Sequence, residues 1–115
     1  MRDHTKLKAF QLADELALQT CILTRTFPRE ELFCLTSQMR RAAISAASNI
    51  VEGCARHTEA DYVHFLDVAY GSARELQYQL SLASCLGYVP ASAPVQDLCE
   101  QTTKVLNALI RSLRL

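Results

Sequence analysis

The chain has 115 residues, half of them apolar, and its twelve basic and twelve acidic side chains cancel at neutral pH. This length suits one domain, residues 1–115, with a single core, and the apolar content excludes a disordered chain. Zero net charge gives no global attraction to nucleic acid or to anionic membranes, so any basic contact would need a local patch.

The first two helices are predicted from apolar residues at helical spacing. The first covers residues 5–26 and ends before Pro28, because the residue preceding a proline is pushed out of the α region. The second covers residues 36–56, and Thr36 or Ser37 can cap it by accepting an amide hydrogen bond in its first turn.

The third and fourth helices have clearer start and stop signals. Thr58 and Asp61 resemble a capping box that begins a helix over residues 58–86, and Gly87 fits the left-handed residue that closes it. A fourth helix covers residues 93–114, with a proline in its first turn. Since no stretch alternates with period two, we expect no strands. Short connections then predict an all-α, antiparallel up-down-up-down four-helix bundle.

The second helix has more apolar surface than one neighbour can cover. Its apolar arc spans roughly 220°, against roughly 100° for an ordinary surface helix. The side around Met39 and Ile50 is expected to fill the core, and the third helix carries a second apolar stripe of its own. The first and fourth helices have simpler faces that the bundle can cover. The surplus predicts a homo-oligomer built through the middle two helices. The residues expected at its interface are Arg40, Ile44, Ala47, Val51, Val68, Gly71, Glu75 and Leu82.

The five cysteines are at least thirteen residues apart and form no C-x-x-C pair. We expect them to be small buried hydrophobic residues of a protein in a reducing cytoplasm. No signal peptide pattern and no apolar run of about 18 residues is present, which predicts a cytoplasmic protein that does not span a membrane.

Catalytic and metal-binding patterns are weak. Asp61-x-x-His64, with His57 one turn earlier, only approximates the ligand set of a di-iron bundle, so we expect solvated helix-end residues and no metal. No phosphate loop, nucleophile elbow or dinucleotide fingerprint occurs, and no cysteine has an adjacent histidine or lysine to activate it. We therefore predict no catalytic residue, no cofactor and no enzyme activity.

The polar strip of the second helix leaves three interpretations open. It is a solvated face with pairs such as Ser45–Asn49 and Glu52–Arg56, or a seam in which Asn49 and Glu52 bond to the third helix and fix register. The third interpretation is a basic strip for nucleic-acid phosphates, partly quenched by nearby acids. Its residues are Arg40, Arg41, Arg56 and Arg74.

Four motifs in order carry a resemblance to a known family. They are LTSQMRRA at 35–42, SNIVEG at 48–53, YGSAREL at 70–76 and LGY at 86–88. With them the chain resembles the four-helix bundle proteins first noted in intervening sequences of bacterial large-subunit ribosomal RNA genes. The resemblance extends from the first helix to Tyr88, and the last helix matches only in pattern.

The resemblance implies a left-handed antiparallel bundle that assembles into a ring-like homopentamer, in a family whose members mostly have no assigned activity. The family also includes the accessory variability determinant of diversity-generating retroelements. That relative is a pentameric barrel that binds a reverse transcriptase and has nucleic-acid affinity through a strongly basic surface. This chain departs from it in having zero net charge, since counterion release supplies much of nonspecific nucleic-acid affinity. The motif residues, expected to be architectural or assembly-directed, are Arg40, Asn49, Glu52, Gly53, Gly71 and Glu75.

Two hypotheses of function follow. The leading one is a cytoplasmic, non-enzymatic, homo-oligomeric and pentameric scaffold or interaction protein, whose partner is another copy of itself. The alternative is an accessory protein that binds RNA or DNA and acts with a nucleic-acid enzyme such as a reverse transcriptase. Neither hypothesis involves a membrane or a metal.

Overall fold

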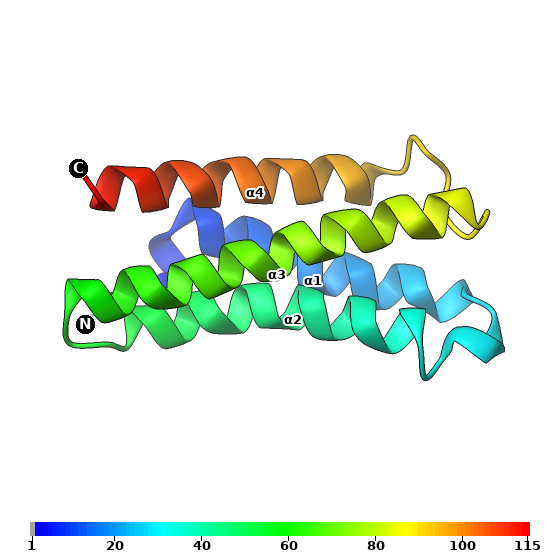
Figure 1. Ribbon diagram of the computed structural model, residues 1–115, viewed down its shortest axis with the longest axis horizontal. Helices are drawn as coiled ribbons and strands as arrows, with labels where there is room; N and C mark the ends of the chain where they lie inside the picture. The colour runs from blue at the N-terminus through cyan, green and yellow to red at the C-terminus, as the bar shows by residue number, and fades with distance from the viewer. Residues whose placement is uncertain (1) are drawn as a thin grey trace.

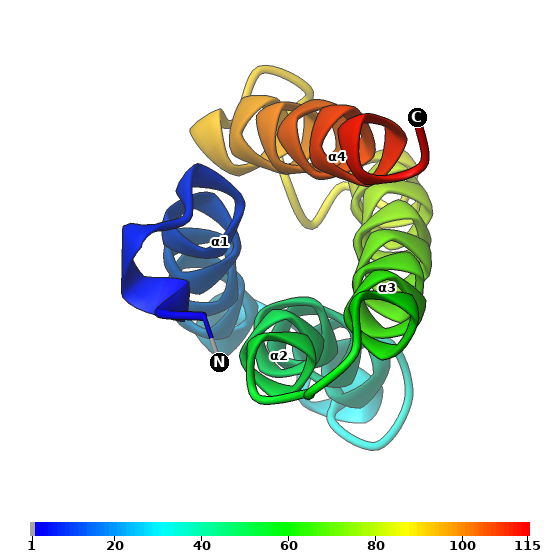
Figure 2. The ribbon, with the colours of Figure 1, turned by 90° about the vertical axis from the view of Figure 1, so that its left-hand side faces the viewer.

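The computed structural model describes residues 2–115, which form four helices and no strand (Figure 1). Successive helices run in opposite directions, and the end-on view shows them around one core in the order α1, α2, α3, α4 (Figure 2). The predicted all-α, up-down-up-down bundle is confirmed. The helices are α1 (Lys8–Leu23), α2 (Leu35–Cys54), α3 (Glu59–Cys85) and α4 (Pro94–Leu113), with 3-10 turns η1 (His4–Lys6), η2 (Thr24–Thr26) and η3 (Arg29–Glu31). None of these helices is long and apolar enough to cross a bilayer.

The local signals at the ends of α3 and α4 behave as predicted. The Thr58 hydroxyl accepts a hydrogen bond from the Asp61 backbone N–H at 3.1 Å, which caps α3. Gly87 has φ of 82° just after α3, a conformation that glycine adopts without the clash of a Cβ atom. Pro94 lies in the first turn of α4, after Ala93 as the cap. Each signal acts over a few residues of chain.

The predicted cap of α2 is wrong. α2 begins at Leu35 after Cys34, with no side-chain cap, and both Leu35 and Thr36 are buried inside the first turn. Ser37 lies one residue further into the helix. The start of α2 is therefore set by burial of its first turn against the bundle end, which outweighs the capping preference of the hydroxyl side chains.

α1 is shorter than the predicted helix at both ends. Residues 4–6 and 24–26 form 3-10 turns instead of continuing the α-helix. At the second of these, the Thr24 hydroxyl donates to the carbonyl of Thr20 at 2.9 Å, and Phe27 is extended before Pro28 as the proline rule requires.

The core contains the expected side of α2, with Met39 and Ile50 fully buried. The expectation for the cysteines is only partly right. Cys54 and Cys99 are buried and Cys21 is intermediate, but Cys34 and Cys85 are exposed. Cys34 precedes α2 and Cys85 is the last residue of α3, so both stand at helix ends that the bundle does not cover.

α2 and α3 approach each other closely at Gly53. A Cβ atom added there would lie 3.0 Å from the Phe65 Cβ and 3.2 Å from the Tyr62 carbonyl oxygen. Glycine at this position therefore lets the two helices pack without displacing the α3 backbone. Gly71, by contrast, faces open space, with nothing within 4 Å of an added Cβ.

Candidate functional site

The residues expected at an interface lie on the outer surfaces of α2 and α3. Ile44 is 50% exposed, Val51 and Leu82 are each 37% exposed, and Val68 is 39% exposed. Large apolar side chains at such positions are in contact with solvent in the single chain. Of the other four, Gly71 and Glu75 are exposed and Arg40 and Ala47 are intermediate.

Hydrogen bonds fix which side of α2 faces each neighbour. Arg40 Nε donates to the hydroxyl of Thr24, at the end of α1, at 2.8 Å. Ile44 follows Arg40 by one helical turn and so continues the α1 side of α2. Ser45 and Ser72 share a hydrogen bond of 2.8 Å across to α3. The α1 side and the α3 side of α2 are separated on the outer surface by a polar band of exposed Arg41, Ser48 and Glu52.

α1 adds apolar surface that the sequence analysis missed. Leu18 is 54% exposed and Ile22 is 41% exposed, so the expectation that the bundle covers α1 completely is wrong. Leu18 and Ile22 are an i,i+4 pair on the side of α1 that faces away from the buried residues Ala13, Leu16 and Thr20. We call Leu18, Ile22, Ile44 and Val51 the α1–α2 face.

The second stripe of α3 is exposed along its length, as the periodicity indicates. Besides Val68 and Leu82 it includes Leu86, which is also exposed at the end of α3. Gly71, in the same stretch, leaves the backbone open to a close approach. We call Val68, Gly71, Leu82 and Leu86 the α3 face.

The polar strip of α2 forms the pairs of the first interpretation. Asn49 Nδ2 donates to the carbonyl and hydroxyl oxygens of Ser45 at 2.8 and 3.0 Å, and Arg56 forms an ion pair with Glu52. The bonds from Asn49 and Glu52 to α3 that the second interpretation requires are not formed among residues 2–115. Contact with α3 is made by Ser45 instead. A polar hollow of about 350 Å³ lies beside it, lined by Gln38, Arg41, Ala42, Ser45, Ser72 and Glu75.

The arginines of the third interpretation do not gather into one surface. Arg56 is neutralised by Glu52 and lies over the Phe65 ring at 4.8 Å. Arg74 Nη1 donates to the Tyr70 hydroxyl at 3.1 Å on α3, whereas Arg41 lines the hollow between α2 and α3. Arg40 instead faces the α1–α2 connection, where Arg25 and Arg29 join it in lining a pocket. No pattern in the sequence groups these two with Arg40, because Arg25 lies at the end of the first predicted helix and Arg29 in the connection that follows.

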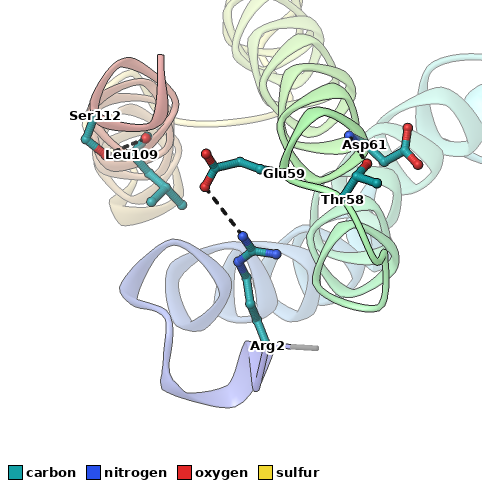
Figure 3. A network of polar contacts seen from close by, with 6 residues as sticks. All are labelled: Arg2, Thr58, Glu59, Asp61, Leu109 and Ser112. Carbon is teal, nitrogen blue, oxygen red and sulfur yellow. Dashed lines mark hydrogen bonds and ion pairs between the residues drawn. The ribbon is translucent and has the colours of Figure 1, made fainter. Parts of the chain in front are cut away.

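The opposite end of the bundle is closed by the N-terminal segment. Arg2 forms an ion pair with Glu59 at 3.6 Å (Figure 3). Its guanidinium also lies 3.9 Å from the centre of the Tyr62 ring. The Arg2 backbone N–H also donates to the Cys54 carbonyl at 3.0 Å. Burial raises the pKa values of the Cys54 thiol and the Tyr62 hydroxyl, so both stay protonated near neutral pH.

The weak metal pattern does not converge. His57, Asp61 and His64 are all exposed, and the described part of the chain holds no group of three or more His, Cys, Asp or Glu side chains placed for a metal. Burial raises the pKa of Cys99 to about 12. A thiol held in this way is the opposite of an activated nucleophile, which needs a lowered pKa.

Comparisons with known proteins agree with this architecture. The sequence model described as 23S rRNA-intervening sequence protein matches residues 5–110. A crystal structure from Bacteroides thetaiotaomicron, of a protein with unknown function from the S23 ribosomal protein family, superposes with a TM-score of 0.82. It is 23% identical and covers 90% of this chain and 95% of that chain, a likeness that shows the fold alone. A comparison with curated proteins found no match.

Proposed function

Because the chain belongs to the family of 23S rRNA-intervening sequence proteins, we propose that it is a non-enzymatic, homo-oligomeric bundle that serves as an assembly or interaction scaffold. One observation carries the proposal: large apolar side chains are exposed on the outer sides of α1 and α2, the α1–α2 face, and on the outer side of α3, the α3 face. Exposed apolar surface of this kind usually marks a protein interface.

The two faces favour head-to-tail assembly. They differ in composition and are separated by the polar band of Arg41, Ser48 and Glu52. A contact between two different faces is heterologous, and heterologous contacts close into a ring when the rotation per subunit divides a full turn. The family resemblance favours five subunits in that ring. In this arrangement each α1–α2 face packs on the α3 face of the next copy.

The chemistry of the chain supports a structural role in the cytoplasm. Its buried thiols are kept protonated, and the polar residues of α2 are engaged in pairs with one another. All five cysteines are free, as suits a reducing compartment. Gly53 acts in the packing of α2 on α3, which fits an architectural role for the motif that contains it.

Sedimentation velocity at micromolar concentration tests the proposal. We expect the unmodified chain to sediment as a closed oligomer. Ile44→Glu, on the α1–α2 face, and Leu82→Glu, on the α3 face, should each sediment as monomers, because each buries a charge at one side of every contact. Mixing the two variants should restore a dimer and nothing larger, since one intact face of each kind remains.

Ser48→Glu in the polar band is the matched control and should leave the oligomer intact. Circular dichroism of each variant separates loss of assembly from loss of folding. A monomeric unmodified chain would overturn the proposal. A mixture of the two variants that stays monomeric would overturn the head-to-tail arrangement.

A further inference from the structure

The corner where α1 turns into α2 holds a pocket of about 270 Å³ with an unusual lining. It lies at the cyan end of the bundle in Figure 1. Three arginines, Arg25, Arg29 and Arg40, line it with the hydroxyl side chains Thr24 and Thr36, and no acidic residue is part of the lining. The remaining wall is apolar.

Arg40 is held in place before any ligand arrives. Its Nε donates to the hydroxyl of Thr24 at 2.8 Å, and that hydroxyl donates in turn to the Thr20 carbonyl at 2.9 Å. Thr24 is only 3% exposed, so this anchor is fixed by the core. Of the five N–H donors of a guanidinium, the four on its terminal nitrogens are left for a ligand. Little side-chain entropy remains to be lost when one binds.

The positive charge of the pocket is not compensated by the protein. Within residues 2–115 the ion pairs use Arg2, Arg56, Lys104 and Arg114, and none uses a pocket arginine. The acids closest in sequence are on η3, where Glu31 accepts a hydrogen bond from the Tyr88 hydroxyl at 2.8 Å and Glu30 is exposed. Guanidinium groups without acidic partners create a local positive potential even though the net charge of the chain is zero.

We propose that this corner is an oxyanion site that binds one phosphate group, carried either by a nucleic-acid backbone or by a free nucleotide. Arginine presents a planar fork that matches phosphate oxygens, and such charge-assisted bonds are the strong ones. The pocket is slightly smaller than the roughly 300–1,000 Å³ of sites that enclose whole small molecules. It therefore fits a phosphate group with the rest of the ligand outside. The site is complete in one chain and goes beyond the scaffold role.

An exposed aromatic residue that is next in the chain to a residue of the pocket lining distinguishes the two sources of phosphate. Phe33 is 93% exposed and directly follows Leu32, a residue of the apolar wall. An exposed ring next to basic groups can stack a base of a single strand, a contact worth roughly 1–3 kcal/mol per base. Inorganic phosphate has no base, so its binding does not depend on Phe33.

Binding titrations with three probes test the site. Inorganic phosphate and AMP are titrated by calorimetry, and a labelled single-stranded RNA 12-mer by fluorescence anisotropy, all at low salt. We expect Arg40→Gln to weaken binding of the probes at least roughly tenfold. Arg25→Gln with Arg29→Gln should act in the same direction. Arg74→Gln, which removes the same charge from α3, is the matched control and should change binding less than twofold.

The probes then separate the sources. RNA that binds more tightly than AMP, loses affinity with salt and depends on Phe33 identifies a nucleic-acid backbone. AMP that binds as tightly as RNA, with Phe33→Ala unchanged for both, identifies a free nucleotide. Absence of binding by all three probes overturns the proposal, and so does equal weakening by Arg40→Gln and Arg74→Gln. Arg40→Lys keeps the positive charge but not the planar fork of the guanidinium. Unfolding curves check that each variant is folded.

Discussion

At the end of the bundle where α2 turns into α3, three arginines have acidic partners, namely Arg2, Arg56 and Arg114. Arg2 pairs with Glu59, and its guanidinium also covers the Tyr62 ring. Arg56 and Arg114 each form an ion pair with a carboxylate as well. This closed end is also where α2 and α3 approach each other closely at Gly53.

At the other end, where α1 turns into α2, three arginines lie together without acidic partners in the described part of the chain. Arg25, Arg29 and Arg40 line one pocket and none of them has an ion-pair partner among residues 2–115. Cys34 and Phe33 are exposed at this open end. The zero net charge of the whole chain is therefore compatible with a local group of three arginines that have no ion-pair partner among residues 2–115. Charge balance over a whole sequence does not exclude a local anion site.

The largest expected contrast between the ends is in thiol reactivity. Cys34 and Cys54 bracket α2, one exposed at the open end and one buried at the closed end. We compare variants in which Cys34 or Cys54 is the single remaining cysteine. We expect a disulfide reagent to react with Cys34 at least roughly a hundredfold faster than with Cys54, since Cys54 must wait for a local opening. Raising the pH to 9 should leave Cys54 slow, because burial raises its pKa.

Both single-cysteine variants should react at similar rates in urea, which serves as the control. Similar rates in the folded state would contradict a tightly packed closed end.

Glycine substitutions test the difference in packing and have the next largest expected effect. Gly53→Val should destabilise the chain by roughly 2–3 kcal/mol, because the added groups meet Phe65 and the Tyr62 backbone of α3. Gly71→Ala is the matched variant, measured in the monomeric Leu82→Glu background where the α3 face is open, and should stabilise that chain by roughly 0.5–1 kcal/mol through helix propensity. Urea unfolding curves measure both. A neutral Gly53→Val would show that α2 and α3 are not in close contact there.

The fold could be predicted from the sequence because its signals are local or periodic. Thr58 marks a helix end through a side-chain cap, Gly87 through its positive φ and Pro94 through its place in a first turn, and each signal acts within a few residues. Thr36 shows where this fails. Its hydroxyl looks like a cap, but long-range burial places it inside α2, and no short window of sequence contains that information.

The candidate surfaces could be predicted only in part. Periodicity identifies Ile44 and Leu82 as members of an apolar stripe, and both are exposed. It does not say whether a neighbouring helix covers a stripe, which is why Leu18 and Ile22 were missed. Arg25 and Arg29 lie near Arg40 because the chain reverses direction between α1 and α2. Residue spacing along a single helix does not predict such a contact.

Charge removal at the two ends gives the smallest expected effect and the sharpest test of the electrostatic contrast. Arg2→Gln should lower the free energy of unfolding by about 0.5–1 kcal/mol, chiefly through loss of the contact with the Tyr62 ring. Arg29→Gln should instead raise it by about 0.3 kcal/mol at low salt, since it relieves repulsion among three unpartnered guanidinium groups. The two variants lose the same charge, so a difference in sign cannot come from net charge. Urea unfolding at 20 mM and 500 mM salt measures both.

Salt and phosphate distinguish the causes of these changes. The gain in unfolding free energy from Arg29→Gln should vanish in 500 mM salt, because that repulsion is screened within a few ångströms. The loss in unfolding free energy from Arg2→Gln should largely persist, because the ring contact is partly buried. Added phosphate should stabilise the unmodified chain through binding to the folded state, and Arg29→Gln should reduce that stabilisation while Arg2→Gln leaves it unchanged. If Arg29→Gln destabilises the chain as much as Arg2→Gln in both salts, the arginines of the open end are already compensated within the fold, and the contrast between the two ends is lost.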